Sequence, residues 1–307
     1  MKLIDAAEKF KFHCKFERNL DKNTLRAYTI DLQQFIEKFS TLKISQIDKF
    51  LIKEHIEYLY NLNYKIKTIK RKVAIIKAFF NYLEFDELIE NTPFNKLKLS
   101  IKEPKILPET MELREIETIL NYLHKNRNKT DNNTFKYKTL TKDLLVAEIL
   151  FATGIRVSEL SNLKRKDINL KSGLIKIFGK GSKERIIQIC DKEVLGLIKE
   201  YLQLFKLGPN DYFLINKLGK RLSEQSIRLT IHKYMKKIGL TKHITPHIFR
   251  HSFATLLLEE GVDIRYIQNM LGHSSISTTQ IYTQVSMKHQ KKLLKTKHPR
   301  RNLKFVS

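Results

Sequence analysis

Six side chains in the second half of the chain are of the types that attack and rejoin a phosphodiester. They are Arg156, Lys180, His247, Arg250, His273 and Tyr282. A tyrosine hydroxyl can serve as the nucleophile, and cationic side chains can stabilise the charge that develops on the nonbridging phosphate oxygens. A lysine on a flexible turn can deliver the proton that the leaving alkoxide needs. Each residue alone is weak evidence, because arginine and lysine are mostly surface residues.

The stretch TPHIFRHSFAT predicts a helix that begins with an anion-binding end. Thr245 followed by Pro246 is typical of a helix start, with the threonine as the N-cap and the proline as the first helical residue. His247 and Arg250 then lie on the first turn, three residues apart and on the same side. Because a helix N-terminus already favours anions, this pair is suited to phosphate oxygens.

The stretch LGHSSISTTQIYTQV predicts how the last two candidates are presented. Gly272 is typical of a helix end, which places His273 on a loop tip. Ser277 and Gln280 have the spacing of a capping box for a new short helix, so Tyr282 falls on its second turn. The competing interpretation is that Tyr282 is a half-buried packing residue, which is the commonest role of a helical tyrosine.

Two other kinds of site are disfavoured by the same stretches. GLIKIFGKGS can be mistaken for a phosphate-binding P-loop, but the spacing from Gly173 is one residue too long and Lys180 is followed by glycine. His247 and His251 have the spacing of a zinc-binding helix, but isoleucine replaces the required glutamate and Arg250 would place a cation beside the metal. We therefore expect no metal site and no cofactor.

The composition is that of a globular protein with a polyanionic partner. The chain has 307 residues, 42% of them hydrophobic, which is enough for two domains. Its formal net charge of +26 is spread along the whole chain, which favours nucleic acid over an anionic membrane. No segment approaches the length of an apolar span, and Asp5 and Glu8 lie where a signal peptide would be apolar. Cys14 and Cys190 have no metal-like spacing, and we expect them to be reduced and buried.

The first hundred residues carry the apolar periodicity of helices. One apolar stripe extends from Leu25 to Phe39 and another from Ile66 to Phe80, with further helices expected over 3–18 and 46–62. Asn23 and Thr24 offer capping oxygens for the first of these stripes. The pattern predicts a small helical bundle.

Basic residues fill the positions opposite the apolar stripe of the 66–80 helix. They are Lys65, Lys67, Lys70, Arg71, Lys72 and Lys77. Such a face is often simply solvated, but in a chain of charge +26 it predicts contact with DNA phosphates.

The rest of the chain divides into a linker and a mixed domain. Residues 91–108 contain three of the six prolines and no sustained periodicity, which predicts a linker. Residues 124–143 are polar and patternless, which predicts a loop. Strands are predicted over 174–178 and 185–190, joined by a turn in GKGSKE that carries Lys180.

These motifs together resemble those of the tyrosine recombinase family, specifically bacterial Xer-type recombinases and related integrases. The stretches that carry the resemblance are ATGIRVSEL, GKGSKER, HIFRHSFAT, LGHSSISTTQIYT and the terminal HPR. They occur in order, with spacings of 24 from Arg156 to Lys180, 26 from His247 to His273, and 9 from there to Tyr282. The likeness covers nearly the whole chain, because TLRAYTIDLQQF and its surroundings resemble the core-binding domain of that family.

The resemblance implies a mainly helical fold with a small β-sheet, arranged as a C-shaped clamp around duplex DNA. A SAM-like helical core-binding domain over 1–90 would precede a mixed α/β catalytic domain over 109–307. Tyr282 would attack the scissile phosphate to give a 3′-phosphotyrosyl link and a free 5′-hydroxyl. Lys180 would protonate the 5′ oxygen, and His247 would assist proton transfer from the tyrosine.

The resemblance assigns the remaining site residues to the phosphate. Arg156, Arg250 and His273 would bind it in the transition state, and Glu159 would orient or support these groups without reacting. Because the phosphotyrosyl bond conserves the phosphodiester energy, rejoining would need neither ATP nor metal. The implied reaction is conservative strand exchange.

The resemblance also implies partners and a cellular role. Four protomers, of this chain alone or with a related recombinase, would act on two inverted-repeat DNA sites, each donating its last helix to a neighbour. QKKLLKTKHPRR is either such a helix or a basic solvated tail. We expect a cytoplasmic, nucleoid-associated enzyme of chromosome dimer resolution, with or without an accessory activator protein. A mobile-element integrase or invertase and a non-catalytic DNA-binding regulator are the alternatives. Two departures from the family are the polar stretch 124–143, which looks longer than usual, and residues 301–307 beyond the HPR.

Overall fold

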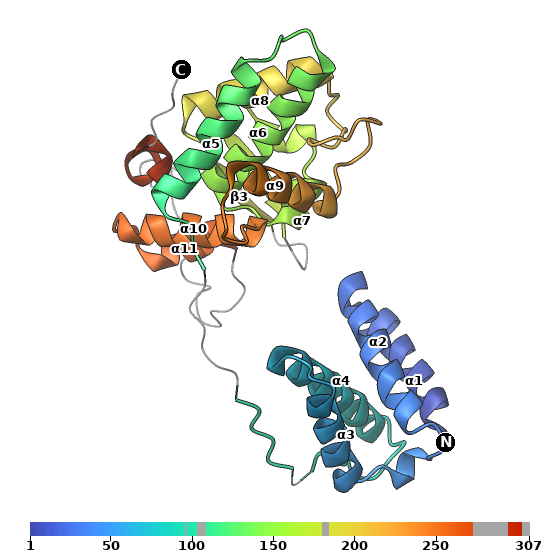
Figure 1. Cartoon of the computed structure of the whole chain (residues 1–307). Helices are drawn as coiled ribbons and strands as arrows, with labels where there is room; N and C mark the ends of the chain where they lie inside the picture. Colours follow the sequence, from blue (N-terminus) through green and yellow to red (C-terminus); the bar gives the residue numbers. More distant parts are fainter. Residues whose placement is uncertain (96, 103–108, 180–183, 273–293, 303–307) are drawn as a thin grey trace. The chain divides into compact units, whose positions relative to one another are not determined.

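The computed structural model of the chain describes residues 1–95, 97–102, 109–179, 184–272 and 294–302 (Figure 1). The chain divides into two compact units, Met1–Ile106 and Leu107–Ser307, each with a hydrophobic core of its own. Most elements are helices, and a small sheet lies in the second unit, which confirms the predicted mainly helical fold.

The first unit is a helical bundle, as the apolar periodicity predicted. Its helices are α1 (Leu3–Phe12), which a π-helical turn over His13–Glu17 continues, α2 (Lys22–Lys38), α3 (Lys49–Asn61) and α4 (Ile66–Phe85), with a short 3-10 turn over Ile44–Gln46. Helices α1, α2 and α3 each pack against α4. Phe10, Phe35, Phe79 and Phe80 are fully buried between them. Neighbouring rings meet edge to face, an arrangement that aromatic pairs favour.

Helix α2 begins at Lys22, earlier than predicted, because a different residue caps it. Asp21 accepts hydrogen bonds from the N–H groups of Asn23 and Thr24, both at 3.0 Å. The two predicted caps therefore lie inside the first turn. The aspartate satisfies N–H groups that a helix start leaves without partners, and its charge is favourable at the positive end of the helix dipole.

One of the six basic residues assigned to the exposed face of α4 is buried. Lys72 is 4% exposed, its ammonium lies 2.9 Å from Asp31 Oδ1, and it also donates to Gln34 of α2. Arg71 Nη1 lies 3.2 Å from the other oxygen of Asp31. The prediction was wrong for Lys72, because a carboxylate on a neighbouring helix supplies a buried counter-charge that the periodicity of α4 alone does not reveal. The exposed members are Lys65, Lys67, Lys70, Arg71 and Lys77.

We expect Lys72→Ala to destabilise the first unit while DNA affinity changes little. Removing one partner of a buried ion pair costs up to about 3–5 kcal/mol. Because Arg71 stays beside Asp31, we expect a loss of stability near the lower end of this range. Urea unfolding followed by circular dichroism measures the stability, and a DNA titration without urea measures the affinity. Lys77→Ala is the control, because it removes an exposed lysine from the same helix. A fall in affinity without a fall in stability for Lys72→Ala would contradict the structural role.

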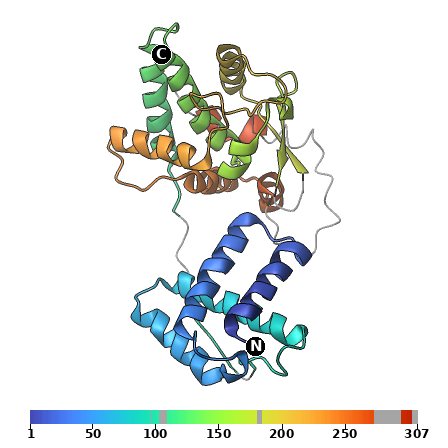
Figure 2. The same ribbon diagram turned by 90° about the vertical axis from the view of Figure 1, so that its right-hand side faces the viewer.

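The second unit is built around one central helix, α6. Its helices are α5 (Leu113–Asn128), α6 (Phe135–Thr153), α7 (Val157–Asn162), α8 (Lys192–Phe205), α9 (Glu224–Ile238), α10 (Pro246–Glu259) and α11 (Ile264–Leu271), with short 3-10 segments over Arg165–Asp167 and Pro299–Asn302. Helix α6 packs against α5, α8, α9 and α10 (Figures 1 and 2). Every residue from Leu144 to Thr153 is buried, which explains why this stretch is apolar on every side except at Glu148 and Thr153.

The small sheet has three antiparallel strands in the order β1 (Ile168–Asn169), β2 (Leu174–Phe178) and β3 (Glu184–Gln188). The predicted strand pair is confirmed, with the second strand ending two residues earlier than expected. Strand β1 was not predicted, because two residues carry no alternation. The register pairs Phe178, the last residue of β2, with Glu184, the first residue of β3.

The polar stretch 124–143 is mostly helical, so the predicted long loop was wrong. Only a short turn separates α5 from α6, and Thr134 caps α6 by accepting from the N–H of Tyr137 at 3.1 Å. Arg127 and Tyr137 both donate to Glu200 of α8. A polar network between three helices holds this stretch in place, and such a network leaves no apolar periodicity in the sequence.

The described C-terminal residues pack on the second unit. His298 Nε2 lies 3.0 Å from the carbonyl oxygen of Ala152, and burial lowers the pKa of His298 to about 4, so its ring is neutral. Arg300 is 4% exposed and its Nε donates to Glu148 Oε2 at 3.0 Å. The alternative prediction of a basic solvated tail was therefore wrong for His298 and Arg300. Donation of the last helix to a neighbouring copy stays a prediction.

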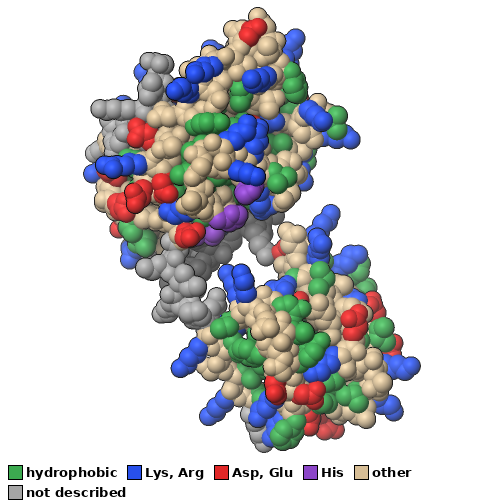
Figure 3. Space-filling model, viewed as in Figure 1, with side chains coloured by type: hydrophobic (Ala, Val, Ile, Leu, Met, Phe, Trp, Pro, Cys, Tyr) green, Lys and Arg blue, Asp and Glu red, His purple; other side chains and the backbone are tan. Residues whose placement is uncertain are grey.

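The composition is reflected in the structure in three ways. Lys and Arg side chains are spread over the visible face of both units (Figure 3). Within the described ranges, no helix is both long enough and apolar enough to cross a membrane. Cys14 and Cys190 are free thiols, the first buried and the second only partly buried.

Candidate active site

Helix α6 ends at a glycine that directs the chain toward Arg156. Gly154 has a φ of 59°, in the left-handed region. A Cβ at this position would lie 2.6 Å from Phe253 and 2.8 Å from Leu271, so a larger residue would be both strained and crowded. The chain then enters α7 with Arg156 as its N-cap residue.

Arg156 is held by one carboxylate and two carbonyl groups. Its backbone N–H and its Nη1 donate to the two oxygens of Glu159, each at 2.9 Å. Nη1 also donates to the carbonyl of Leu271 at 3.3 Å, and Nη2 to that of Gly272 at 2.9 Å. The side chain keeps 37% of its surface exposed, so part of it stays accessible to a ligand.

The helix that carries His247 and Arg250 begins as predicted. Thr245 is the N-cap, and its side chain accepts a backbone N–H from the first turn, while Pro246 is the first helical residue. His247 is exposed, and its Nε2 lies 2.9 Å from Nε2 of His251. Arg250, nearly one turn after His247, is buried. The two predicted site residues of α10 therefore differ sharply in solvent access.

Arg250 is a buried cation whose two guanidinium Nη atoms donate to carbonyl groups. It is 4% exposed, and its Nη1 and Nη2 donate to the carbonyls of Gly154 and Leu271, each at 2.7 Å. Among the described residues, no carboxylate forms an ion pair with it. Burial first, and then the positive charges of Arg156 and Arg185, lower the pKa of Arg250 to about 9. Arginine stays protonated in proteins, so the lowered pKa marks a site that would be stabilised by an anion.

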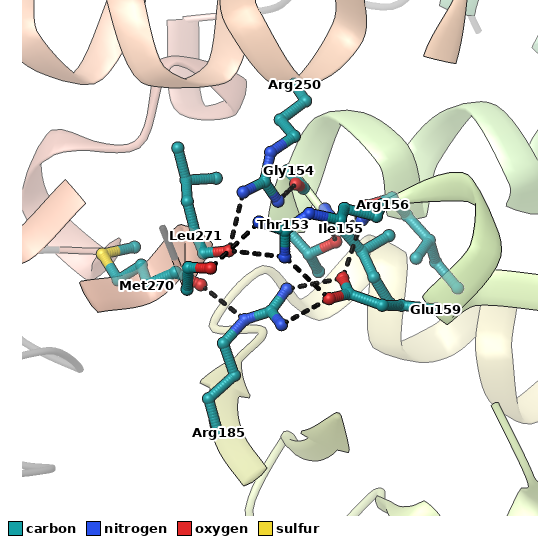
Figure 4. A network of polar contacts seen from close by, with 11 residues as sticks. Thr153, Gly154, Ile155, Arg156, Glu159, Arg185, Arg250, Met270 and Leu271 are labelled. Carbon is teal, nitrogen blue, oxygen red and sulfur yellow. Dashed lines mark hydrogen bonds and ion pairs between the residues drawn. The ribbon is translucent and has the colours of Figure 1, made fainter. Parts of the chain in front are cut away.

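The acceptors that gather the arginines are the last carbonyls of α11. A helix leaves its final carbonyls without partners inside the helix, and cations are favourable at that end of its dipole. The Leu271 carbonyl accepts from both Arg156 and Arg250, and the Met270 carbonyl accepts from Arg185 Nε at 2.9 Å. Figure 4 shows the three guanidinium groups converging on this helix end from different elements.

Arg185 completes a cluster of charged side chains, which consists of Arg156, Glu159, Arg185 and Arg250. Its place in this cluster was not predicted. Its Nη1 and Nη2 each donate to one oxygen of Glu159 at 2.7 Å, and its side chain is 12% exposed. Gly272 has a φ of 64°, and a Cβ there would lie 3.1 Å from the Arg185 side chain, so the glycine that ends α11 also lets Arg185 pass. The available signal was the place of Arg185 in GKGSKER, but an arginine beside a lysine-rich turn is usually a surface residue.

Glu159 compensates only part of the charge of these arginines. Burial raises its pKa, but the hydrogen bonds and charge of Arg185 and the hydrogen bonds of Arg156 together outweigh burial, so the pKa lies below its ordinary value. The carboxylate is therefore ionised at neutral pH. With Arg250, the cluster holds three positive charges and one negative charge, which leaves two positive charges uncompensated.

The structure brings together Arg156, Glu159 and Arg250, three of the residues predicted from the sequence. In the described part of the chain, no group of three His, Cys, Asp or Glu side chains could hold a metal ion. Of the other predicted residues, His247 is exposed on α10 beside His251. Lys180, His273 and Tyr282 lie outside the described residues.

Two family profiles match most of the chain. The profile of the phage integrase family matches residues 109–289, and that of the phage integrase N-terminal SAM-like domain matches residues 7–85. The chain therefore belongs to the phage integrase family.

Individual relatives are tyrosine recombinases. One from Agathobacter rectalis is 47% identical over 295 residues, which cover 95% of this chain and 96% of the relative. The tyrosine recombinase XerD of Staphylococcus epidermidis is 35% identical over 301 residues, which cover 95% of this chain and 98% of the relative. Among solved structures, XerH site-specific recombinase bound to its difH substrate matches with a TM-score of 0.69 and 27% identity, over 91% of this chain and 82% of that one. The predicted resemblance is thereby confirmed, and with it the assignment of the chain as a site-specific DNA recombinase.

Proposed function

We propose that this recombinase cleaves and rejoins DNA through a 3′-phosphotyrosyl intermediate on Tyr282, with the scissile phosphate bound by Arg156 and Arg250. One observation carries the proposal. Arg250 is 4% exposed and donates to two carbonyls, and no carboxylate pairs with it among the described residues. A buried guanidinium is costly unless a negative charge compensates it. A phosphate beside the partly exposed Arg156 would supply that charge.

The contacts of the cluster support roles for three further residues. Arg156 Nη2 donates to the carbonyl of Gly272, the residue immediately before His273, which supports His273 as a further phosphate ligand. Glu159 fixes the backbone and side chain of Arg156 and acts as a supporting residue. His247, exposed at the start of the helix that carries Arg250, is the group proposed to take the tyrosine proton.

The proposed step breaks one bond for each bond that it forms. The phenolic oxygen of Tyr282 attacks phosphorus as the bond from phosphorus to the 5′ oxygen breaks. The tyrosine proton passes to His247, and Lys180 gives a proton to the 5′ oxygen, which leaves as a hydroxyl. Arg156 and Arg250 stabilise the charge on the nonbridging oxygens throughout. Rejoining is the reverse step with the 5′-hydroxyl of a partner strand, so the phosphodiester energy is conserved.

The proposed substrate is duplex DNA with an inverted-repeat site, held by the second unit and by the exposed basic face of α4. Contacts between lysines and phosphates release counterions, so binding should weaken steeply with salt. The active form is proposed to be a tetramer on two DNA sites, made of this chain alone or with a related recombinase, and with or without an accessory activator protein. The face comprises Lys65, Lys67, Lys70, Arg71 and Lys77.

The proposed cellular role is Xer-type resolution of chromosome dimers, in the cytoplasm and at the nucleoid. Similarity to a XerD over 95% of this chain and 98% of the relative supports this role.

Covalent capture tests the function and finds the target together. The protein is mixed with fragmented genomic DNA of its own source in EDTA, the reaction is stopped with detergent, and protein-linked DNA is sequenced. We expect one short inverted-repeat site, with the modified peptide containing Tyr282 when analysed by mass spectrometry. Tight binding without covalent DNA, also after candidate partner recombinases are added, would favour a non-catalytic regulator. An adduct that forms only when Mg²⁺ is restored would contradict metal-independent cleavage.

Lys180→Ala should slow cleavage according to the leaving group. On an ordinary strand, the cleavage rate should fall about 1,000-fold. On a strand with sulfur in place of the 5′ oxygen, the cleavage rate should fall less than about 10-fold, because a thiolate leaves without a proton. Single-turnover cleavage of nicked duplexes with the captured site gives both rates. Lys176→Ala is the matched control, since Lys176 lies on β2 of the same hairpin and pairs with Glu184. If Lys180→Ala slowed cleavage of both strands equally, Lys180 would not be the general acid.

A further inference from the structure

We propose that Arg185 is a positioning residue for DNA cleavage, which neutralises Glu159 so that Arg156 and Arg250 remain available to the scissile phosphate. The inference rests on the proposed function of that arginine pair. It assigns a role to a residue that does not itself bind the substrate.

Arg185 joins three elements through one guanidinium group. From β3, its Nη1 and Nη2 form a two-pronged contact with Glu159 of α7, each at 2.7 Å, and its Nε donates to the carbonyl of Met270 in α11 at 2.9 Å. Arginine suits this position because its planar fork matches a carboxylate and still has a further donor. With 12% of the side chain exposed and these donors directed at protein groups, Arg185 acts through its neighbours (Figure 4).

Arg185 and Arg156 share a single carboxylate. Each oxygen of Glu159 accepts one bond from Arg185 at 2.7 Å and one from Arg156 at 2.9 Å. Without Arg185, the charge of Glu159 would fall on Arg156 alone, and the cluster would keep one uncompensated positive charge instead of two. A phosphate would then compete with Glu159 for Arg156, the more exposed member of the pair.

Arg185 also holds the helix end on which the other two arginines converge. Its acceptor, the Met270 carbonyl, immediately precedes Leu271, whose carbonyl accepts from both Arg156 and Arg250. The close approach of Arg185 to Gly272 adds a packing contact at the same helix end. One side chain therefore sets both the charge balance of the pair and the position of its shared acceptor.

The test compares a charged and a neutral scissile group. Nicked duplexes with the captured site carry either the natural phosphodiester or a methylphosphonate at the cleavage position. We expect Arg185→Ala to slow cleavage of the phosphodiester about 100-fold but that of the neutral methylphosphonate less than about 10-fold, because the latter depends less on positive charge. A role confined to folding would slow both reactions equally.

A second substitution tests the neutralisation directly. In the Arg185→Ala background, Glu159→Gln removes the carboxylate charge while an amide oxygen can still accept from Arg156. We expect the double variant to recover to within about 10-fold of the wild-type rate on the phosphodiester, since two uncompensated positive charges are restored. A double variant that is no faster than Arg185→Ala would overturn the charge mechanism.

Control variants separate positioning from folding. Arg127→Ala removes an arginine whose side chain is similarly exposed, 14%, and which pairs with Glu200 between α5 and α8. This control should lower the stability of the protein, but it should not slow cleavage of the phosphodiester more than cleavage of the methylphosphonate. If Arg185→Ala does not fold, Arg185→Gln is used, which removes the charge but keeps a hydrogen-bonding side chain, and which should slow cleavage of the phosphodiester about 100-fold and that of the methylphosphonate less than about 10-fold. Wild-type rates for both Arg185 variants would overturn the inference. Failure of the wild-type chain to cleave either duplex would overturn the proposed function on which it rests.

Discussion

Tyr282→Phe is expected to abolish covalent attachment to DNA. The substitution removes the phenolic oxygen and nothing else, so cleavage should fall by at least about 10⁴-fold, as expected when a nucleophile is deleted. DNA affinity should change by less than about 3-fold, because the aromatic ring and all the basic residues of the chain remain. Detergent-stable adducts on the captured site measure the first quantity, and a binding titration in the same buffer measures the second.

The control for this experiment is another tyrosine of the second unit. Tyr212→Phe removes the hydroxyl of a partly exposed tyrosine that contacts Arg221, and should leave adduct formation unchanged. If Tyr282 were only a packing residue, Tyr282→Phe would form adducts at the wild-type rate. That outcome would remove the nucleophile from the proposed mechanism, whatever the DNA affinity.

Arg250→Lys is expected to lower the cleavage rate at saturating DNA about 1,000-fold, although the positive charge is kept. Arg250 donates from two nitrogens to the carbonyls of Gly154 and Leu271, and we propose that the same planar group also binds the phosphate. A lysine ammonium is a compact charge on a flexible stem and cannot span these acceptors together. DNA affinity should fall much less than the rate, because we propose that other basic residues also bind the phosphate backbone.

Single-turnover cleavage of the nicked duplex measures the loss, and the unfolding midpoint shows whether the variant is folded. Arg127→Lys is the matched control, because Arg127 is also an arginine with little exposed surface, 14%, and it pairs with Glu200 outside the arginine cluster. It should lose stability to a similar degree but keep its cleavage rate. Equal cleavage rates for the two variants would mean that Arg250 is a structural residue and that the phosphate is bound elsewhere.

Features governed by short stretches could be predicted from the sequence. The cap at Thr245, the proline after it and the glycine that ends α11 act through the chain within a few residues of themselves. The helices of the first unit and the pairing of β2 with β3 follow from apolar periodicity and a short connection, which are also local. The motif residues could be named because their types and spacings resemble those of a known family.

Features governed by distant partners could not be predicted in this way. Lys72 has the spacing of a surface lysine, but it is buried because Asp31 of another helix compensates its charge. Residues 124–143 have no apolar pattern, because a polar network that includes Glu200 holds them in helices. In each case the partner lies far away in sequence, so composition and periodicity carry no trace of it.

The sequence by itself therefore determined the class of enzyme and predicted its site residues, and the tertiary structure decided how the charges of the arginine cluster are balanced. Arg156 and Arg250 could be named in advance, but their shared acceptor at Leu271 depends on how α11 packs against the ends of α6 and α7. Arg185 enters the cluster only because β3 places it between Glu159 and Met270. Electrostatic interactions depend on distance in space, and only the folded chain brings residues more than a hundred positions apart within hydrogen-bonding distance.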